Sequence, residues 1–364
     1  MPGRRSAVAF ALVLVVGFVG ALANPALSRW PQADLRDGSW ARAYQAALDQ
    51  ASPLRPAAVA LWNAIDLALF RQAPEGVVLG ADGWLFTAEE YALPPDPDAL
   101  RATAVARVQA VDQRLAADGV RLVVTLVPAK AALVDAGQPP LPRAAAERYD
   151  RLLATLRGAG VEAVDLRPAL SAMGDDAWLR TDTHWTPAGA LAAANALATS
   201  LRALLPDLAG DAPARLESLG REPHHGDLLA LLELGPLATW VAPDPDPLER
   251  MRLVRPPPAG GDLFAPVALP LAVVGTSYAA DARWRLSDRL EVALGVEVLD
   301  AAAIGDGPFG PMEAYLEGPA YREAHPRAVV WEIPERYLDD PAFVIEPASR
   351  DASPSSAEPA WRRW

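Results

Sequence analysis

The order of apolar and polar positions in the middle of the chain predicts helices and strands in alternation. The segment RLVVTLV, at residues 121–127, is apolar almost throughout, which indicates a strand buried on both faces. A second helix over about residues 143–157 and a second strand over 161–166 continue the alternation. The first helix of the alternation precedes the strand at residues 121–127. Its apolar residues recur at helical spacing, at Ala104, Val108, Val111 and Leu115, and Gly119 follows as its stop.

The same alternation resumes in the last third of the chain. Three short apolar runs predict strands, at residues 271–275, 296–299 and 327–333. A helix between the first two is marked by leucines four residues apart, Leu286, Leu290 and Leu294. Strands separated by helices form parallel sheets with helices on both faces. We therefore predict an α/β protein of three layers, α/β/α, around a mainly parallel central sheet.

Residues 206–270 interrupt this pattern. The stretch is irregular and rich in proline, so we predict loops and an insertion over one end of the sheet. His224 and His225 fall within it, and we expect them to belong to a loop rather than to take part in catalysis. Earlier in the chain, Asp82-Gly83 predicts a turn before a short apolar strand.

The N-terminal sequence carries an export signal. A pair of arginines precedes an uncharged, mainly apolar run at residues 6–23. This pattern is typical of a signal peptide or of an uncleaved signal anchor over residues 1–25. The sequence ALA at the end of the run suits a signal peptidase, yet the run is also about long enough to span a bilayer. Either alternative predicts that the rest of the chain lies in the periplasm of a Gram-negative cell, free or anchored in the inner membrane.

The rest of the chain divides into three predicted parts. An N-terminal helical segment covers residues 26–75, and the main α/β domain covers 76–340. A tail over residues 341–364 is rich in serine and proline, and we expect it to be disordered. The main domain is long enough for one substantial core.

Composition excludes several classes of function. The 364 residues include no cysteine and only four histidines. Neither a thiolate nucleophile nor a cysteine-ligated metal is therefore available, and the histidines show no metal-binding spacing. We predict no metal site. The formal net charge of −13 argues against binding to nucleic acid, because phosphate neutralisation needs a basic surface.

Ligands of open α/β sheets bind beyond the carboxyl ends of the strands, and one serine stands there. In LAVVGTSYAA, Ser277 follows a predicted strand and precedes a helix, whose backbone N–H groups could hold an oxyanion. In TDTHWTPAGA, Asp182 and His184 precede a helix that Thr186 caps and Pro187 begins. A serine nucleophile needs a base, and an imidazole base needs a carboxylate to fix its tautomer. We therefore predict a triad of Ser277, His184 and Asp182.

Four further residues are candidates for supporting roles at this site. Thr276 and Tyr278 flank the serine and could shape the oxyanion or acyl pocket, although the tyrosine could equally belong to the core. Trp185 could stack on a sugar ring or wedge its loop in place, and we favour the wedge. Lys130 follows a strand on the same sheet edge, where it could contact a carboxylate or acetyl oxygen or simply lie in solvent.

Four motifs, DGWLF, TDTHWTPAG, VGTSYAA and WEIPERYL, occur here in that order over roughly residues 75–340. In this they resemble the alginate O-acetyltransferase family of the AlgX/AlgJ type. The resemblance implies an SGNH-hydrolase-like domain, circularly permuted so that the serine follows the Asp-His pair. It also implies that Asp182, His184 and Ser277 form the triad.

The resemblance further implies a function. Members of the family acetylate hydroxyls of an exopolysaccharide, here alginate or a related polymer, during its synthesis and export. The acetyl donor would be supplied by a membrane-bound O-acyltransferase, so no cofactor is expected. Two alternatives stay open: an acetyl esterase that uses the same triad, and a non-catalytic polysaccharide-binding scaffold of the export complex.

Overall fold

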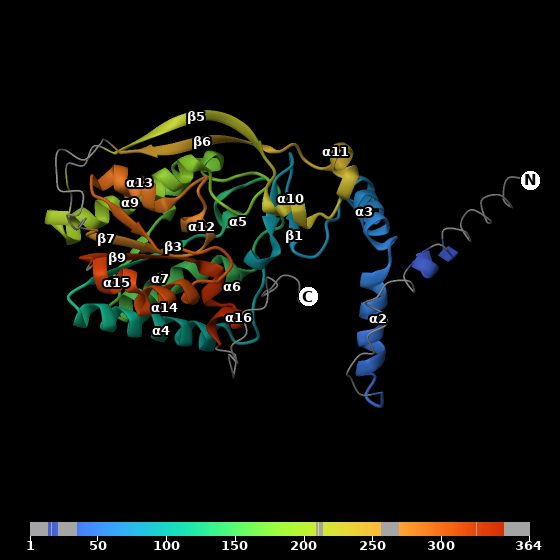
Figure 1. Ribbon diagram of the computed structural model, residues 1–364, viewed down its shortest axis with the longest axis horizontal. Coiled ribbons are helices and arrows are strands. Elements are labelled where there is room, and N and C mark those ends of the chain that lie inside the picture. The colour runs from blue at the N-terminus through green and yellow to red at the C-terminus, as the bar shows by residue number, and fades with distance from the viewer. Residues whose placement is uncertain are drawn as a thin grey trace, which may run out of the picture. The chain divides into compact units, whose positions relative to one another are not determined.

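The computed structural model describes residues 14–15, 17–20, 35–208, 210, 214–255, 269–324 and 326–345 (Figure 1). The chain falls into two compact units. One contains the chain up to Pro74 together with Leu232–Ala242, and the other contains Glu75–Leu231 and the chain from Pro243 onward. Every residue of the predicted site belongs to the second unit.

Five parallel strands form the central sheet of the second unit. Their order across the sheet is β4-β3-β9-β7-β8, and every neighbouring pair is parallel. The strands are β3 (Arg121–Val127), β4 (Ala163–Asp165), β7 (Leu271–Val274), β8 (Val298–Asp300) and β9 (Ala328–Pro334). The predicted parallel sheet is therefore confirmed. Because β9 lies between β3 and β7, the carboxyl ends of these three strands meet at one edge.

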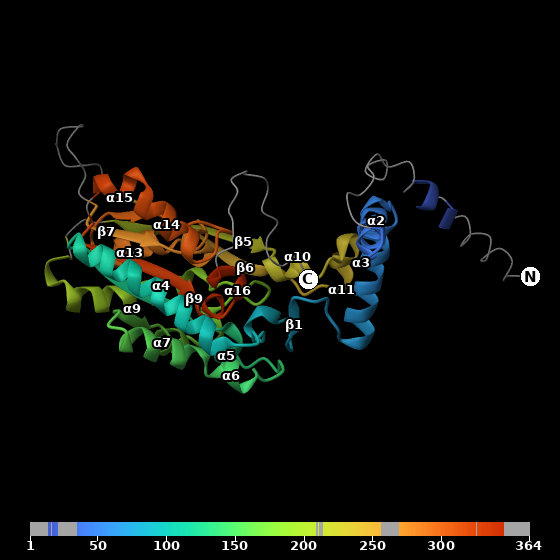
Figure 2. The same ribbon diagram turned by 90° about the horizontal axis from the view of Figure 1, so that it is seen from below.

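Helices cover both faces of the sheet, which confirms the three-layer prediction (Figures 1 and 2). One face packs against α9 (Pro187–Leu204) and α13 (Leu286–Leu294). The other packs against α4 (Pro97–Ala117), α7 (Arg148–Gly158) and α14 (Phe309–Glu317). Shorter helices of the same unit are α5 (Lys130–Leu133), α6 (Arg143–Ala146), α8 (Arg167–Ser171), α10 (Asp227–Leu231), α12 (Ser277–Ala280), α15 (Pro319–Ala324) and α16 (Pro341–Val344).

Alternate residues of the strands enter opposite cores. In β3, Val123 and Val127 join the core under α9 and α13. The residues between and beside them, Leu122, Val124 and Leu126, join the core under α4, α7 and α14. Successive side chains of a strand point to opposite faces, and both faces are covered here. The segment RLVVTLV is apolar almost throughout for that reason.

The prediction of loops over residues 206–270 is wrong in part. β5 (Arg215–His224) and β6 (Asp246–Val254) form a long antiparallel ribbon that runs along α9 and α13 (Figure 1). Most of its side chains are exposed or half-buried. No regular apolar alternation therefore marked these strands in the sequence. Residues 256–268 of this stretch lie outside the described residues.

The predicted turn at Asp82-Gly83 is confirmed. It joins β1 (Val77–Leu79) to β2 (Leu85–Thr87), which pair antiparallel. Asp82 and Gly83 both have positive φ, 51° and 80°. Two successive residues of this kind match the twist of a hairpin, and Asp-Gly is a favoured pair for it.

The first unit is helical in the residues that the structure describes. It contains α2 (Ser39–Ala51), α3 (Arg55–Ile65) and α11 (Ala238–Val241). Most of the predicted signal segment, residues 1–25, and most of the predicted tail, 341–364, lie outside the described residues. The domain limits given above stay predictions. In the described part of the chain, no helix is both long and apolar enough to cross a membrane.

Candidate active site

Ser277 begins α12, directly beyond the carboxyl end of β7. Thr276 caps this helix, with its hydroxyl accepting from the N–H of Tyr278 at 3.4 Å. The buried carboxylate of Glu332, in β9, accepts from the N–H of Thr276 at 2.8 Å and from its hydroxyl. A Cβ at Gly275 would lie 2.6 Å from Glu332 Oε2. Glycine is needed at 275 for this close approach, and its φ is not positive.

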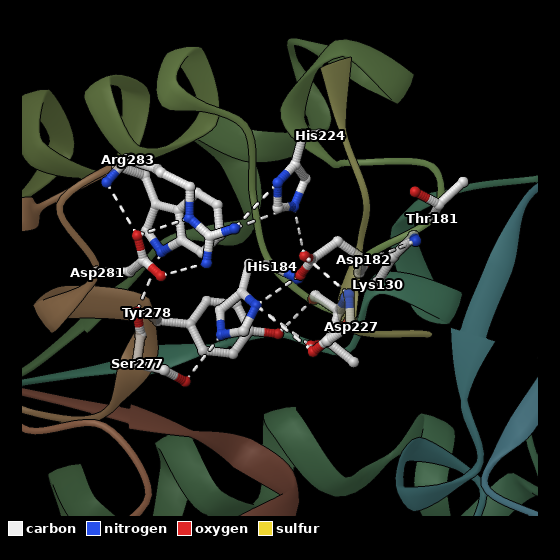
Figure 3. Close-up of polar contacts among 12 residues, drawn as sticks. Lys130, Thr181, Asp182, His184, His224, Asp227, Ser277, Tyr278, Asp281 and Arg283 are labelled. Atoms are coloured by element: carbon white, nitrogen blue, oxygen red, sulfur yellow. Dashed lines mark hydrogen bonds and ion pairs between the residues drawn. The ribbon is translucent and has the colours of Figure 1, made fainter. Parts of the chain in front are cut away.

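Asp182, His184 and Ser277 lie in one line of hydrogen-bonding groups (Figure 3). His184 Nε2 lies 2.8 Å from Ser277 Oγ, and His184 Nδ1 lies 2.6 Å from Asp182 Oδ1. Asp182 Oδ1 also accepts from the backbone N–H of His184 at 2.9 Å. The structure thus brings together the three side chains that the sequence predicted as a triad. His184 and Ser277 are 93 residues apart in the chain, so the sequence alone could not show that their side chains meet.

The electrostatics of Asp182 suit an anion beside a base. Its side chain is 2% exposed. Burial alone would raise the pKa of Asp182, but hydrogen bonds from His184 and His224 outweigh it and hold the pKa far below its usual range. The carboxylate is therefore ionised at neutral pH. A fixed anion at this place can orient the imidazole and stabilise the imidazolium.

Lys130 holds the backbone of the loop that carries Asp182. Its buried ammonium donates to the carbonyl oxygens of Leu85 at 2.6 Å, Asp182 at 2.9 Å and Arg180 at 3.2 Å. An ammonium has three donors, and these carbonyls take all three. The suggestion that Lys130 contacts substrate is therefore wrong. Burial lowers the pKa of Lys130 to about 8, although the negative charge of Glu90 acts to raise it.

Aromatic side chains pack around the base. Tyr278 is buried, donates its hydroxyl to the carbonyl of Thr183 at 2.6 Å, and lies against His184 with ring centroids 4.5 Å apart. Trp185 is fully buried and meets Tyr278 edge-on, which fits the predicted wedge and leaves no face for a sugar ring. Trp284, which the sequence did not single out, stacks on His184 at 4.8 Å.

The ends of the β5–β6 ribbon supply further contacts that sequence reasoning missed. His224 and Asp246 are partners in its register. Asp246 is buried and accepts from the N–H groups of Arg180 and Thr181 at 3.0 and 2.8 Å. His224 Nε2 lies 2.7 Å from Asp182 Oδ2. The expectation that His224 belongs merely to a loop is corrected, since it ends a strand and contacts the predicted acid. His225 is exposed.

The backbone N–H groups around Ser277 are the candidate oxyanion donors. The N–H of Thr276 donates to Glu332 and that of Tyr278 donates to Thr276. The N–H of Ser277 has no acceptor among the described residues, and it stands at the start of a helix. It is a candidate donor to the oxyanion that forms on an acyl carbonyl oxygen when Ser277 Oγ attacks the carbonyl carbon.

One group of side chains has the ligand types of a metal site. One potential ligand atom each of Asp182, His184 and Asp227 lies within 4.8 Å of the others. However, His184 Nδ1 is hydrogen-bonded to Asp182, and the carboxylate of Asp227 accepts from the N–H and hydroxyl of Thr183. These partners fit a base and its supporting loop, so we do not assign a metal to them.

The fold and the site together define a class of protein. A serine at the start of a helix after a parallel strand, with a histidine and an aspartate from one loop at the same sheet edge, is the arrangement of an SGNH-hydrolase-like domain. The family described as "SGNH hydrolase-like domain, acetyltransferase AlgX" matches residues 77–335. The chain belongs to this family of AlgX/AlgJ type, whose enzyme class is O-acetyltransferase.

Individual relatives agree with this assignment. The chain is 37% identical to the probable alginate O-acetylase AlgJ of Azotobacter vinelandii, over 83% of this chain and 80% of that protein. It is 38% identical to the protein of the same name from Pseudomonas putida, over 92% and 86% of the two chains. The resemblance inferred from the four motifs is therefore confirmed.

Solved structures show the same fold. The O-acetyltransferase domain of Pseudomonas putida AlgJ superposes with a TM-score of 0.64 at 35% identity, covering 74% of this chain and 97% of that one. Pseudomonas aeruginosa AlgX matches with a TM-score of 0.58 at 22% identity, covering 74% of this chain and 65% of that one. The second match shows the fold alone. The predicted SGNH-hydrolase-like fold is confirmed.

Proposed function

We propose that the chain transfers an acetyl group to hydroxyls of an exopolysaccharide, alginate or a related polymer, through Ser277, His184 and Asp182. The observation that carries the proposal is the line of side chains in which His184 contacts Ser277 Oγ at 2.8 Å and Asp182 at 2.6 Å. The AlgJ relatives, named as probable alginate O-acetylases, support the substrate class.

The geometry accounts for both halves of the transfer. Ser277 Oγ attacks the acetyl carbonyl carbon while His184 Nε2 takes the Oγ proton. The donor's leaving group departs with that proton, and Ser277 keeps the acetyl group as an ester. His184 then takes a proton from a polymer hydroxyl, whose oxygen attacks the ester, and Ser277 Oγ regains a proton from His184. Asp182 stays an anion and stabilises each imidazolium.

The first test follows the covalent intermediate. The full chain is incubated with an activated acetyl ester and its peptides are analysed by mass spectrometry. We expect an acetyl group on Ser277, its absence in Ser277→Ala, and its persistence in the control Ser171→Ala, which changes an exposed serine. Lys130 is the chain's one lysine and is buried, so few amines compete for the reagent. An active-site adduct in Ser277→Ala would overturn the assignment.

A second test separates the transferase from its alternatives. Wild-type chain is given the same ester and an oligosaccharide acceptor, and acetylated sugar and free acetate are both measured. Predominant transfer to the sugar supports the proposal, and predominant release to water would favour an esterase. In cells, polymer acetylation that survives alanine at all three positions would favour a non-catalytic scaffold.

The proposal includes a place for the reaction. The uncharged run at residues 6–23 after two arginines supports export, so we propose that the chain works in the periplasm, at or near the inner membrane. A membrane-bound O-acyltransferase would supply the acetyl donor there. Alkaline phosphatase fused to the C-terminus should be active in cells, because that enzyme folds only after export. An inactive but expressed fusion would contradict periplasmic location.

A further inference from the structure

His224 gives the carboxylate of Asp182 a second imidazole partner. Asp182 Oδ1 faces His184, and Asp182 Oδ2 lies 2.7 Å from Nε2 of the buried His224 (Figure 3). The other contact of Oδ2 is the backbone N–H of Asp227, at 3.2 Å. His224 therefore makes the shorter of the two contacts that fix this oxygen.

The contact with Asp182 places a hydrogen on one ring nitrogen of His224. A carboxylate only accepts hydrogen bonds, so Nε2 must carry the hydrogen that points to Asp182. Arg283 Nη1 lies 2.9 Å from Nδ1 and 3.4 Å from Nε2. An atom this close to both ring nitrogens lies over the face of the imidazole and not on the lone pair of Nδ1. Arg283 therefore packs on the ring of His224, on the side away from its contact with Asp182.

Contacts with residues that follow Ser277 in the chain hold Arg283 in place. Its Nε donates to Asp281 Oδ1 at 2.8 Å, its Nη2 forms an ion pair with the same carboxylate, and its guanidinium lies over the Trp284 ring at 4.5 Å. Asp281 follows α12, and its backbone N–H donates to the carbonyl of Ser277. The chain of contacts from Arg283 to Asp182 therefore starts beside the helix that carries Ser277.

We propose that His224 is a positioning residue for the acetyl transfer, and this rests on the function proposed above. It donates a hydrogen bond to Asp182 Oδ2 and keeps Oδ1 directed at His184 Nδ1, while Arg283 packs on its ring. Without His224, the backbone N–H of Asp227, at 3.2 Å, is the one contact that Oδ2 keeps among the described residues. The carboxylate is then held less firmly in the orientation that serves His184.

Kinetics on a small chromogenic acetate test the role of the donor. His224→Ala should lower kcat on the order of 10²-fold with KM nearly unchanged, since a misplaced orienting group acts on the chemical step. His224→Gln, whose amide can donate from a similar place, should recover most of the loss. His225→Ala, a change at the exposed neighbour, should match wild type. Wild-type kcat in His224→Ala, or an equal loss in the folded alanine and glutamine variants, would overturn the proposal.

A spectroscopic test is independent of activity. The full chain is labelled with ¹⁵N at its four histidines, and His224→Gln identifies the signals of His224. At pH 7.5 we expect a hydrogen on Nε2 of His224. An Nε2 that carries no hydrogen would overturn the assigned direction of the bond to Asp182. If this hydrogen is found but Ser277→Ala keeps full activity, the proposed function fails while the assigned contact stands.

Discussion

The nucleophile turn (residues 275–280) and the base loop (residues 181–185) reach the same sheet edge by different means. The turn follows β7 and continues directly into α12, so its place is set mainly by the strand before it. The base loop contains no regular element apart from one isolated bridge between Trp178 and Trp185. Side chains from distant segments hold it instead. One half of the site is thus specified by its neighbours in the sequence, and the other by the rest of the domain.

A buried ionisable residue nevertheless supports each region. Glu332 accepts from the backbone and hydroxyl of Thr276 in the turn, and Lys130 donates to carbonyls on both sides of Thr181 in the base loop. Burial shifts both pKa values toward neutrality, raising that of Glu332 to about 7 and lowering that of Lys130 to about 8. A buried charge costs free energy unless it is fully hydrogen-bonded. The comparison predicts that the base loop, with more distant supports, is the easier half to disrupt.

The largest effect is expected at the acid of the base loop. Asp182→Asn keeps the shape of the side chain but removes the anion, so kcat should fall on the order of 10⁴-fold, as it does in Ser-His-Asp proteases. Turnover of a chromogenic acetate measures this, with circular dichroism as the check on folding. Asp175→Asn, at an exposed position, is the matched control. A folded variant with wild-type rate would show that Asp182 is not the orienting acid.

The next effect tests the support of the base loop. Lys130→Met keeps the length of the side chain but removes the ammonium that donates to the carbonyls of Leu85, Arg180 and Asp182. The carbonyl of Arg180 keeps the N–H of Leu85 at 2.9 Å. We expect the free energy of unfolding to fall by about 3 kcal/mol and kcat to fall on the order of 10²-fold. Urea unfolding and turnover on the same preparation measure both. Unchanged stability would contradict the role of Lys130 as an anchor.

A smaller effect is expected in the nucleophile turn. A Cβ at Gly275 would lie 2.6 Å from Glu332 Oε2 and 2.9 Å from Glu332 Cβ. Gly275→Ala must therefore move the turn away from β9. We expect a loss of about 2 kcal/mol in stability and a fall in kcat of roughly 10-fold. Gly158→Ala, where nothing lies within 4 Å of the added atom, is the control. If the two variants have equal stability and equal kcat, the close approach of Gly275 to Glu332 is not needed for function.

The smallest effect is a pH dependence from Glu332. Because burial raises its folded pKa to about 7 from 4.5, the folded chain keeps a proton that the unfolded chain loses between these values. The free energy of unfolding should therefore fall as pH rises through this window, by about 1 kcal/mol per pH unit from this group. Glu332→Gln should make the slope shallower, and the exposed control Glu323→Gln should not. Burial also raises the pKa of Glu335 to about 7. Glu335 therefore contributes the same pH dependence in the wild type and in both variants.

The sequence by itself determined the sheet and both halves of the candidate site. Apolar runs marked the five strands, and Thr186 with Pro187 marked the start of α9, because periodicity and capping depend on residues close together in the chain. Ser277 was found from its place after a strand. Asp182 and His184 were found because they share one short loop.

Only the tertiary structure decided what holds that loop in place. His224 lies 42 residues from Asp182, and Lys130 lies 52 residues from it. Asp246 lies 65 residues from Thr181. Contacts over such separations leave no local pattern, and the ribbon that brings His224 and Asp246 together has few buried side chains to reveal it. The residues that hold the loop of His184 in place are therefore determined by how the domain packs, whereas the position of Ser277 follows from the strand that precedes it.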